Sequence, residues 1–148
     1  IANRLGGHHR LMHLPDQLDE HAMAELRKLS EVTETLELLQ RADVVLYGIG
    51  RADDMGRKRQ LPQDVLADVL RRGAVAEAYG CYFDREGNVV FSASSVSHDL
   101  GKLKSGCAML AVAAGSRKAE AIRAVMKSRP QAMLVTDEGA ARAMLGQS

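Results

Sequence analysis

The chain has 148 residues, of which 46% are hydrophobic and 26% charged, a composition typical of one globular domain with a hydrophobic core. Its formal net charge of +1 argues against a DNA-binding surface, because such a surface carries an excess of basic residues that neutralises the phosphates of DNA. The apolar runs are too short to cross a membrane, and no secretion leader is recognisable, so we expect a cytoplasmic protein. Because the chain starts at Ile1 rather than at methionine, we expect a fragment of a longer one.

Short apolar runs alternate with helical patterns along the chain. Val32, Leu36 and Leu39, for example, recur with the spacing of one helix face. Strands separated by amphipathic helices favour a parallel sheet with helices on its faces. The sequence therefore predicts an α/β fold, a three-layer Rossmann-like domain. The predicted strands are residues 10–14, 43–49, 107–113 and 132–136, and the predicted helices are residues 19–28, 31–40, 62–72, 117–127 and 137–145.

One segment departs from this alternation. Residues 79–83 and 88–91, joined by a short turn, predict an antiparallel hairpin, which we expect to cap a sheet edge or to contact another subunit. We find no internal repeat and no Pro/Gly/Ser-rich linker, so residues 1–148 are predicted to form a single domain. Cys81 and Cys107 lie in apolar runs without metal-like spacing, which is typical of buried thiols in a reducing compartment.

The most informative stretch is Ala114-Gly115-Ser116-Arg117-Lys118, where a predicted strand turns into a helix. The start of a helix carries partial positive charge from its unpaired N–H groups, so two cations there are unfavourable. A phosphate bound at that terminus would reverse this cost, because backbone N–H groups and Lys118 would share it. The alternative is that both side chains simply point into water.

A second turn, Gly48-Ile49-Gly50, follows the strand predicted at residues 43–49. The carboxyl ends of strands are where α/β sheets bind ligands, and the glycines would let backbone approach a ligand closely. The motif does not match the glycine motif of dinucleotide-binding proteins, because no third glycine begins a helix at the required spacing. Downstream, Lys58 and Arg59 belong to a basic cluster in a predicted loop, which is either an ordinary surface cluster or a clamp for a second phosphate.

Glu77 lies in an otherwise small and apolar stretch. A carboxylate there must be exposed at an edge or buried with a partner, because burying it alone is expensive. A sugar hydroxyl would be a suitable partner, and a structural salt bridge is the alternative.

Other candidates for chemistry are weaker. His8, His9 and His13 invite a metal interpretation, but no cysteine or carboxylate pair joins them in the sequence, so we expect no metal. Thr136 is predicted to cap the last helix, with Asp137 in its first turn as a structural residue. The sequence holds no nucleophile elbow, no Walker loop and no obvious Cys–His pair. We therefore expect no catalytic residue and no cofactor.

Taken together, four stretches resemble the sugar-binding domains of SorC-type bacterial transcription regulators, and among them repressors of glycolytic genes. They are VVLYGIG at 44–50, GAVAEAYGCYFDREGNVV at 73–90, LAVAAGSRKAEAI at 110–122 and LVTDEGAA at 134–141. Each is short, but their order and spacing are specific, and the similarity runs from about residue 10 to residue 145.

The resemblance implies a sensor domain for a phosphorylated sugar, with fructose-1,6-bisphosphate as the expected effector, in a homo-oligomeric repressor. Lys118 would contact a phosphate and Glu77 the sugar. The turns at Gly48 and Gly50, and at Ala114 and Gly115, would line the pocket. Lys58, beside Arg59, stands where the family has a phosphate-binding arginine. Lysine keeps the charge but loses the bidentate fork, so affinity or phosphate preference would differ.

Members of the family carry a DNA-binding region and a first phosphate-holding strand ahead of the matched part. Neither is found in these residues. We therefore expect operator DNA to be bound only through another domain. The rival hypothesis is an enzyme, because the family's fold is similar to that of sugar-phosphate isomerases, glucosamine-6-phosphate deaminases and CoA transferases. Glu77 would then act as a base. Likeness of fold does not transfer chemistry, so the sensor is the leading hypothesis.

Overall fold

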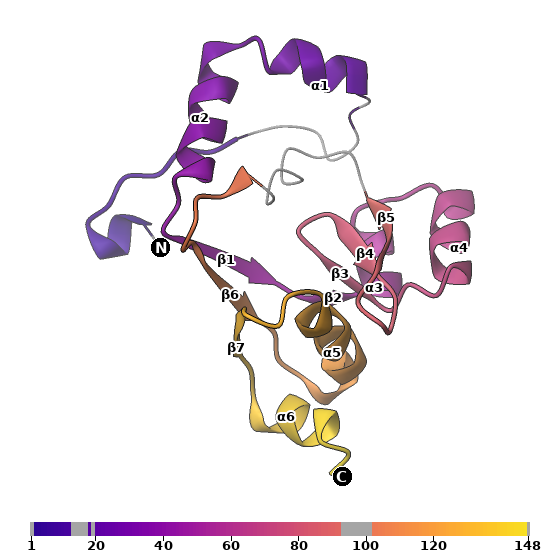
Figure 1. Ribbon diagram of the computed structural model, residues 1–148. Helices are drawn as coiled ribbons and strands as arrows, with labels where there is room; N and C mark the ends of the chain where they lie inside the picture. The colour runs from indigo at the N-terminus through magenta and orange to yellow at the C-terminus, as the bar shows by residue number, and fades with distance from the viewer. Residues whose placement is uncertain (1, 13–17, 19, 93–101, 148) are drawn as a thin grey trace.

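The computed structural model describes residues 2–12, 18, 20–92 and 102–147, and it is an α/β fold built on two separate sheets (Figure 1). A parallel sheet has the strand order β1-β6-β7. Its strands are β1 (Val44–Gly48), β6 (Ala108–Val112) and β7 (Met133–Val135). Three of the four predicted strands are therefore confirmed within a residue or two.

The second sheet is antiparallel, with the order β2-β3-β4-β5. The predicted hairpin is confirmed as β4 (Cys81–Phe83) and β5 (Val89–Ser92). Sequence reasoning missed the two strands that extend it, β2 (Gly50–Arg51) and β3 (Ala76–Ala78). Both are too short to show the period-two alternation that identifies a strand.

Two predictions for the segments outside the sheets are wrong. Residues 10–12 form no strand, and residues 13 and 14 lie outside the described residues. The predicted loop of Lys58 is the end of a helix, whose acidic first turn and basic last turn complement the helix dipole. The helical elements are η1 (Ala2–Leu5), α1 (Glu20–Leu26), α2 (Ser30–Gln40), α3 (Ala52–Lys58), α4 (Gln63–Arg71), η3 (Ser116–Lys118), α5 (Ala119–Ser128) and α6 (Glu138–Met144).

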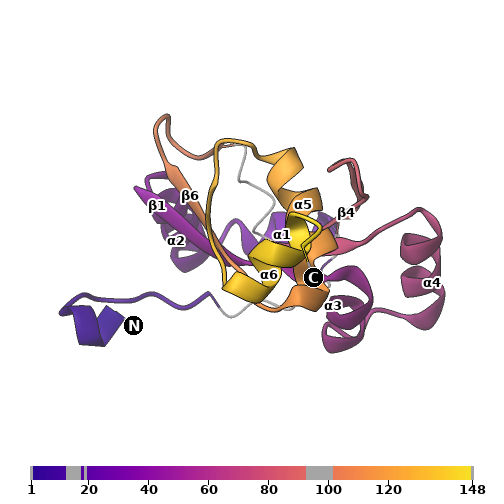
Figure 2. The ribbon, with the colours of Figure 1, turned by 90° about the horizontal axis from the view of Figure 1, so that it is seen from below.

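Helix α5 is the centre of the main core. Ile122 and Val125 are fully buried on it and pack with Ala111 of β6 and Phe83 of β4. The helix thus contacts both sheets, and α6 joins it on the same side of the parallel sheet (Figure 2). A smaller core around Val69 holds α4 against the antiparallel sheet. The two halves of the molecule are therefore fixed to each other through α5.

The opposite face of the parallel sheet is bare in the described part of the chain. Val44 and Leu46 of β1, Val112 of β6, and Met133 and Val135 of β7 are each about half exposed. The strand register places all five on one face. Parallel sheets are usually covered on both faces, and the described residues supply helices to only one of them. None of the described helices is long and apolar enough to cross a membrane.

Gly87 closes the turn between β4 and β5, and we predict that it tolerates no side chain. Its φ is +89°, and an added Cβ would lie 2.8 Å from the Ser128 nitrogen and 2.9 Å from the Ala124 oxygen. Left-handed backbone alone costs an alanine about 1–2 kcal/mol, and the contact with α5 backbone adds to it. Gly87→Ala should therefore lower the free energy of unfolding by about 3 kcal/mol, measured by chemical denaturation.

Gly73 supplies the matched control, because its φ is +87° but an added Cβ meets nothing within 4 Å. Gly73→Ala should cost only the conformational part, about 1–2 kcal/mol. Equal losses of unfolding free energy in the two variants would show that a side chain at position 87 does not clash with the backbone of α5.

Candidate functional site

The turns that the sequence singled out meet at one edge of the parallel sheet. Gly48 ends β1, Ala114 and Gly115 follow β6, and Asp137 follows β7. Because the strands are parallel, these three turns share the carboxyl edge, the place where open α/β sheets bind ligands. Gly50 continues directly into β2, which carries the chain from this edge into the second sheet.

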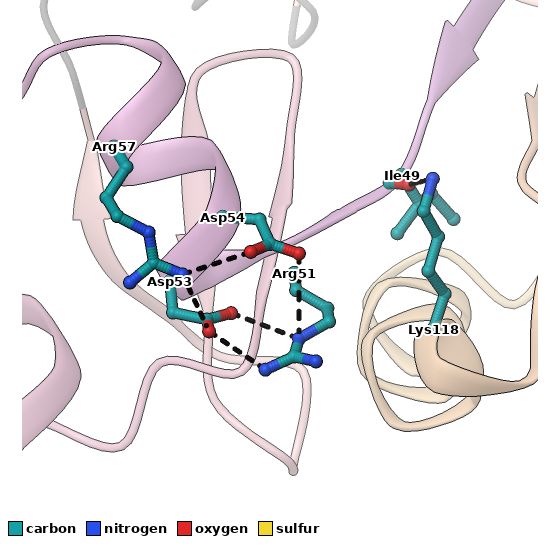
Figure 3. Close-up of polar contacts among 6 residues, drawn as sticks. All are labelled: Ile49, Arg51, Asp53, Asp54, Arg57 and Lys118. Atoms are coloured by element: carbon teal, nitrogen blue, oxygen red, sulfur yellow. Dashed lines mark hydrogen bonds and ion pairs between the residues drawn. The ribbon is translucent and has the colours of Figure 1, made fainter.

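Lys118 joins two of these turns. It is the last residue of η3, and its Nζ donates a hydrogen bond of 3.1 Å to the carbonyl oxygen of Ile49 (Figure 3). The side chain is partly buried, so its ammonium is held at the sheet edge and not in open solvent. Arg117, the neighbouring cation, is exposed. Of the two cations that the sequence flagged together, one therefore faces the edge and the other faces solvent.

The helix expected to start at Arg117 begins with a separate 3-10 turn instead. Residues 116–118 form η3, and α5 starts at Ala119 with the acidic Glu120 in its first turn. Gly115, which precedes η3, has a φ of +101°, a conformation that suits glycine. The two basic residues therefore precede the α-helix, and its first turn has the acid that the dipole favours.

Glu77 is buried on β3, with 3% of its surface exposed. One oxygen, Oε1, accepts hydrogen bonds from Arg59 Nη2 at 3.2 Å and from the Gly80 amide at 2.8 Å. In the pairing of β2 with β3, Glu77 lies opposite Gly50. Of the two environments that the sequence left open, the buried one with a salt bridge is therefore present. The register also brings Glu77 beside the turn that follows β1.

Arg59 and Lys58, predicted to act together, differ in environment. Arg59 caps the C-terminus of α3 and reaches Glu77, with a quarter of its side chain exposed. Lys58 is exposed at the end of the helix. The sequence could not show this division, because the helix α3 itself was not predicted.

A network of four charged residues at the start of α3 was also missed. Arg51 binds both carboxylate oxygens of Asp53, at 3.1 and 2.8 Å, and Arg57 contacts Asp53 at 3.2 Å and Asp54 at 3.0 Å (Figure 3). The i, i+3 and i, i+4 spacing of Arg57 from the two aspartates is the signal that could have revealed it. The network fixes the first turn of α3 immediately after the glycine turn.

Asp137, not Thr136, is the cap of α6. Its carboxylate accepts from the Ala140 amide at 2.9 Å and also from the Gly115 amide at 3.0 and 3.1 Å. These backbone hydrogen bonds, the Gly115 one foremost, hold the pKa of Asp137 below its usual value. The carboxylate therefore fastens the turn after β7 to the turn after β6. One N–H group that the sequence offered to a phosphate is occupied by this side chain.

Two cavities among the described residues lie beside the predicted residues, not around them. One of about 370 Å³ lies between the start of α3 and α5 and is lined by Arg51, Asp53, Arg117 and Glu120 among others. The other, of about 530 Å³, lies at the amino edge of β6 and β7 and includes Cys107. Neither lining includes Lys118 or Glu77, so neither cavity coincides with the predicted site.

The cysteines and histidines offer no reactive centre among the described residues. Cys81 is buried and forms no disulfide, and burial raises the pKa of its thiol, which therefore stays protonated at neutral pH. Cys107 is half-buried and free, so full burial is confirmed for one of the two. His8 and His9 are exposed, and His13 is outside the described part. That part of the chain holds no group of three side chains arranged to bind a metal ion.

Comparisons with known proteins place the chain among the sugar-binding domains of transcription regulators. Residues 1–146 match the Sugar-bind family model, described as "Putative sugar-binding domain". The central glycolytic genes regulators of Priestia megaterium and Bacillus subtilis are 39% and 37% identical over 145 residues. Those matches cover 98% of this chain but only 42% and 43% of the regulators, so the chain spans less than half of their length.

A solved structure agrees with this placement. The SorC family transcriptional regulator from Enterococcus faecalis is 36% identical, with a TM-score of 0.87 over 97% of this chain and 59% of its own. The full-length sorbitol operon regulator of Klebsiella pneumoniae, at 20% identity and a TM-score of 0.81, shares the fold.

Proposed function

The chain belongs to the family of sugar-binding domains found in SorC-type transcription regulators, and on that premise we propose that it senses a phosphorylated sugar for a repressor of sugar-metabolism genes. The regulators of glycolytic genes are its relatives over nearly the whole chain. Fructose-1,6-bisphosphate, a sugar of glycolysis with two phosphates, is therefore the effector that we propose.

The observation that carries this proposal is the position of Lys118. Its ammonium lies at the carboxyl edge of the parallel sheet and reaches the turn after β1 from the turn after β6. A phosphate at this edge would exchange the Ile49 carbonyl for a charged partner, and charge-assisted hydrogen bonds are about twice as strong as neutral ones. Gly48, Gly50 and Ala114 would let the phosphate approach the backbone, and Gly115, whose N–H group donates to Asp137, would line the same edge.

Glu77 and the end of α3 complete the proposed site. Glu77 would accept a hydrogen bond from a sugar hydroxyl, since a carboxylate has acceptor sites beyond those used by Arg59 and Gly80. Lys58, which is exposed at the end of α3, would attract the second phosphate. Arg59, at the C-terminal cap of α3, belongs to the same region.

Binding would regulate DNA binding only through a difference between conformational states. An effector shifts an equilibrium by as much as its affinities for the two states differ. In the proposed mechanism, the bisphosphate draws the two sheets' turns together, favours one arrangement of a homo-oligomer, and weakens operator binding by a separate DNA-binding domain. We propose that this regulator acts in the cytoplasm, where phosphorylated sugars are produced.

The enzyme hypothesis has less support. An isomerase needs a base within reach of a substrate carbon, whereas the sensor requires only that the second oxygen of Glu77 accept a hydrogen bond from a hydroxyl. The relatives are named as transcriptional regulators. Incubation with fructose-6-phosphate, ribose-5-phosphate and glucosamine-6-phosphate tests this directly. A product that disappears in Glu77→Gln would establish the enzyme and contradict the pure sensor.

The decisive experiment is thermal unfolding with and without millimolar fructose-1,6-bisphosphate, fructose-6-phosphate or inorganic phosphate. A ligand at a hundred times its dissociation constant adds about 2.7 kcal/mol to the folded state. We expect a rise in Tm that is largest with the bisphosphate. The measurement should be made on this chain and on the intact regulator. A shift in neither, with any of the three compounds, would contradict the proposal.

A further inference from the structure

Glu77 is held from two sides through a single oxygen. Oε1 accepts from Arg59 Nη2 and from the Gly80 amide, while among the described residues no donor contacts Oε2. Glu77 is 3% exposed as a residue, so the orientation of its carboxylate is set by these two donors and by the strand that carries it. One oxygen is engaged, and the other remains for a ligand.

The turn that supplies the Gly80 amide is strained. Tyr79 and Gly80 have φ values of +43° and +85° and connect β3 to β4 as a two-residue hairpin turn. A tyrosine rarely adopts such a backbone. Its ring is fixed by edge-on contacts with Tyr47, at 5.3 Å between centroids, and with Phe83, at 5.8 Å. Aromatic packing thus maintains the turn that aims an N–H group at Glu77, and such strain tends to collect at functional sites.

Arg59 reaches the same oxygen from the other side. It is at the C-terminal cap of α3, eighteen residues earlier in the chain, and three quarters of its side chain is buried. Its neighbour Lys58 is exposed, and Arg57 is bound to aspartates on its own helix. Of these three consecutive cations, Arg59 is the one directed at Glu77.

We propose that Arg59 is a positioning residue, which acts through Glu77 to select the sugar part of the effector and does not itself hold a phosphate. Arg59 neutralises the buried carboxylate and, with the Gly80 amide, turns Oε2 toward the hydroxyl to be recognised. This inference rests on the proposed function and assigns phosphate affinity and sugar selectivity to different residues. Lys118 and Lys58 provide affinity for phosphate, while the Arg59–Glu77 pair provides discrimination for the sugar that carries it.

The test compares binding of fructose-1,6-bisphosphate and inorganic phosphate to the intact regulator by calorimetry. Arg59→Gln should weaken bisphosphate binding about tenfold, the size expected for a hydrogen bond made by a charged group, and leave phosphate binding within twofold. Arg59→Lys, which keeps the charge but loses the fork, should give an intermediate loss. Arg57→Gln, at an exposed position of α3 two residues earlier in the chain, is the matched control and should change neither affinity.

A double variant separates positioning from direct contact. If Arg59 acts through Glu77, then Arg59→Gln combined with Glu77→Gln should lose no more affinity than Glu77→Gln alone. The double variant also leaves no unpaired buried charge, so it guards against misfolding of the single one. Additive losses, or equal losses for bisphosphate and inorganic phosphate, would overturn the positioning role. Failure of the unmodified regulator to bind the bisphosphate would instead overturn the proposed function itself, and this role with it.

Discussion

Replacing Lys118 by alanine is expected to weaken binding of fructose-1,6-bisphosphate by about 10- to 100-fold. The side chain is partly buried and held at the sheet edge by the Ile49 carbonyl, so a phosphate there would gain a charge-assisted bond in a partly desolvated place. Loss of a hydrogen bond to a charged group costs about 1.5–3 kcal/mol, which corresponds to that range of affinities. Isothermal titration of the intact regulator measures it.

Arg117→Ala is the control for this prediction, since it removes the same charge from the adjacent, exposed position. We expect a loss of less than threefold. Equal losses in the two variants would indicate a diffuse electrostatic attraction and not a built contact. The melting temperature without ligand should fall only slightly in Lys118→Ala, because the bond to Ile49 is worth about 1 kcal/mol.

Phe83→Ala should lower the free energy of unfolding by about 3–5 kcal/mol, the usual cost of truncating a buried aromatic side chain. Phe83 is fully buried in the main core and contacts the ring of Tyr79. Its loss therefore leaves a cavity between α5 and the antiparallel sheet and removes one support of the Tyr79–Gly80 turn. Chemical denaturation followed by circular dichroism measures the change.

Val89 offers a matched comparison on the neighbouring strand. It lies opposite Phe83 in the pairing of β4 with β5 but is 53% exposed. Val89→Ala should change the free energy of unfolding by no more than about 0.5 kcal/mol. A small effect of Phe83→Ala, similar to that of Val89→Ala, would mean that the core around α5 is not closed as described.

The regular elements of the fold could be predicted because their patterns are long and local. The helix predicted at residues 31–40 spans three turns with apolar residues at helical spacing, and it is found as α2 at Ser30–Gln40. The strands at residues 43–49 and 107–113 are apolar runs between turn residues. Fold class, the parallel sheet and the hairpin were therefore accessible from sequence.

The elements that were missed are short or irregular. Helix α3 has only seven residues. Its two buried residues, Ala52 and Gly56, are small and do not form the stripe of large apolar side chains by which a helix is recognised in a sequence. Strand β3 has three residues. The expected strand at residues 10–14 is an apolar run, but a short apolar run is ambiguous without the tertiary contacts that decide it.

The candidate site was predictable in its turns and not in its pairings. The rule that ligands bind at the carboxyl ends of parallel strands led from sequence to Gly48, and the two cations at a predicted helix start led to Gly115 and Lys118. No local pattern could join Arg59 to Glu77, because the contact depends on how α3 packs against β3. Nor could it show that Asp137 would reach back to Gly115, from which η3, α5 and β7 separate it in the chain. Polar contacts between residues far apart in the sequence can be identified only once the tertiary structure is known.

The order in which the sheets can form follows from their topology. In the antiparallel sheet, β3, β4 and β5 are connected by short turns, so their pairing closes only small loops. In the parallel sheet, Val44 of β1 pairs with Ala108 of β6, more than sixty residues later. Loop closure grows costlier with length, and non-local pairing slows folding. The hairpin that carries Glu77 is therefore expected to form early, and the edge that carries Lys118 late, so the two halves of the site come together only at the end of folding.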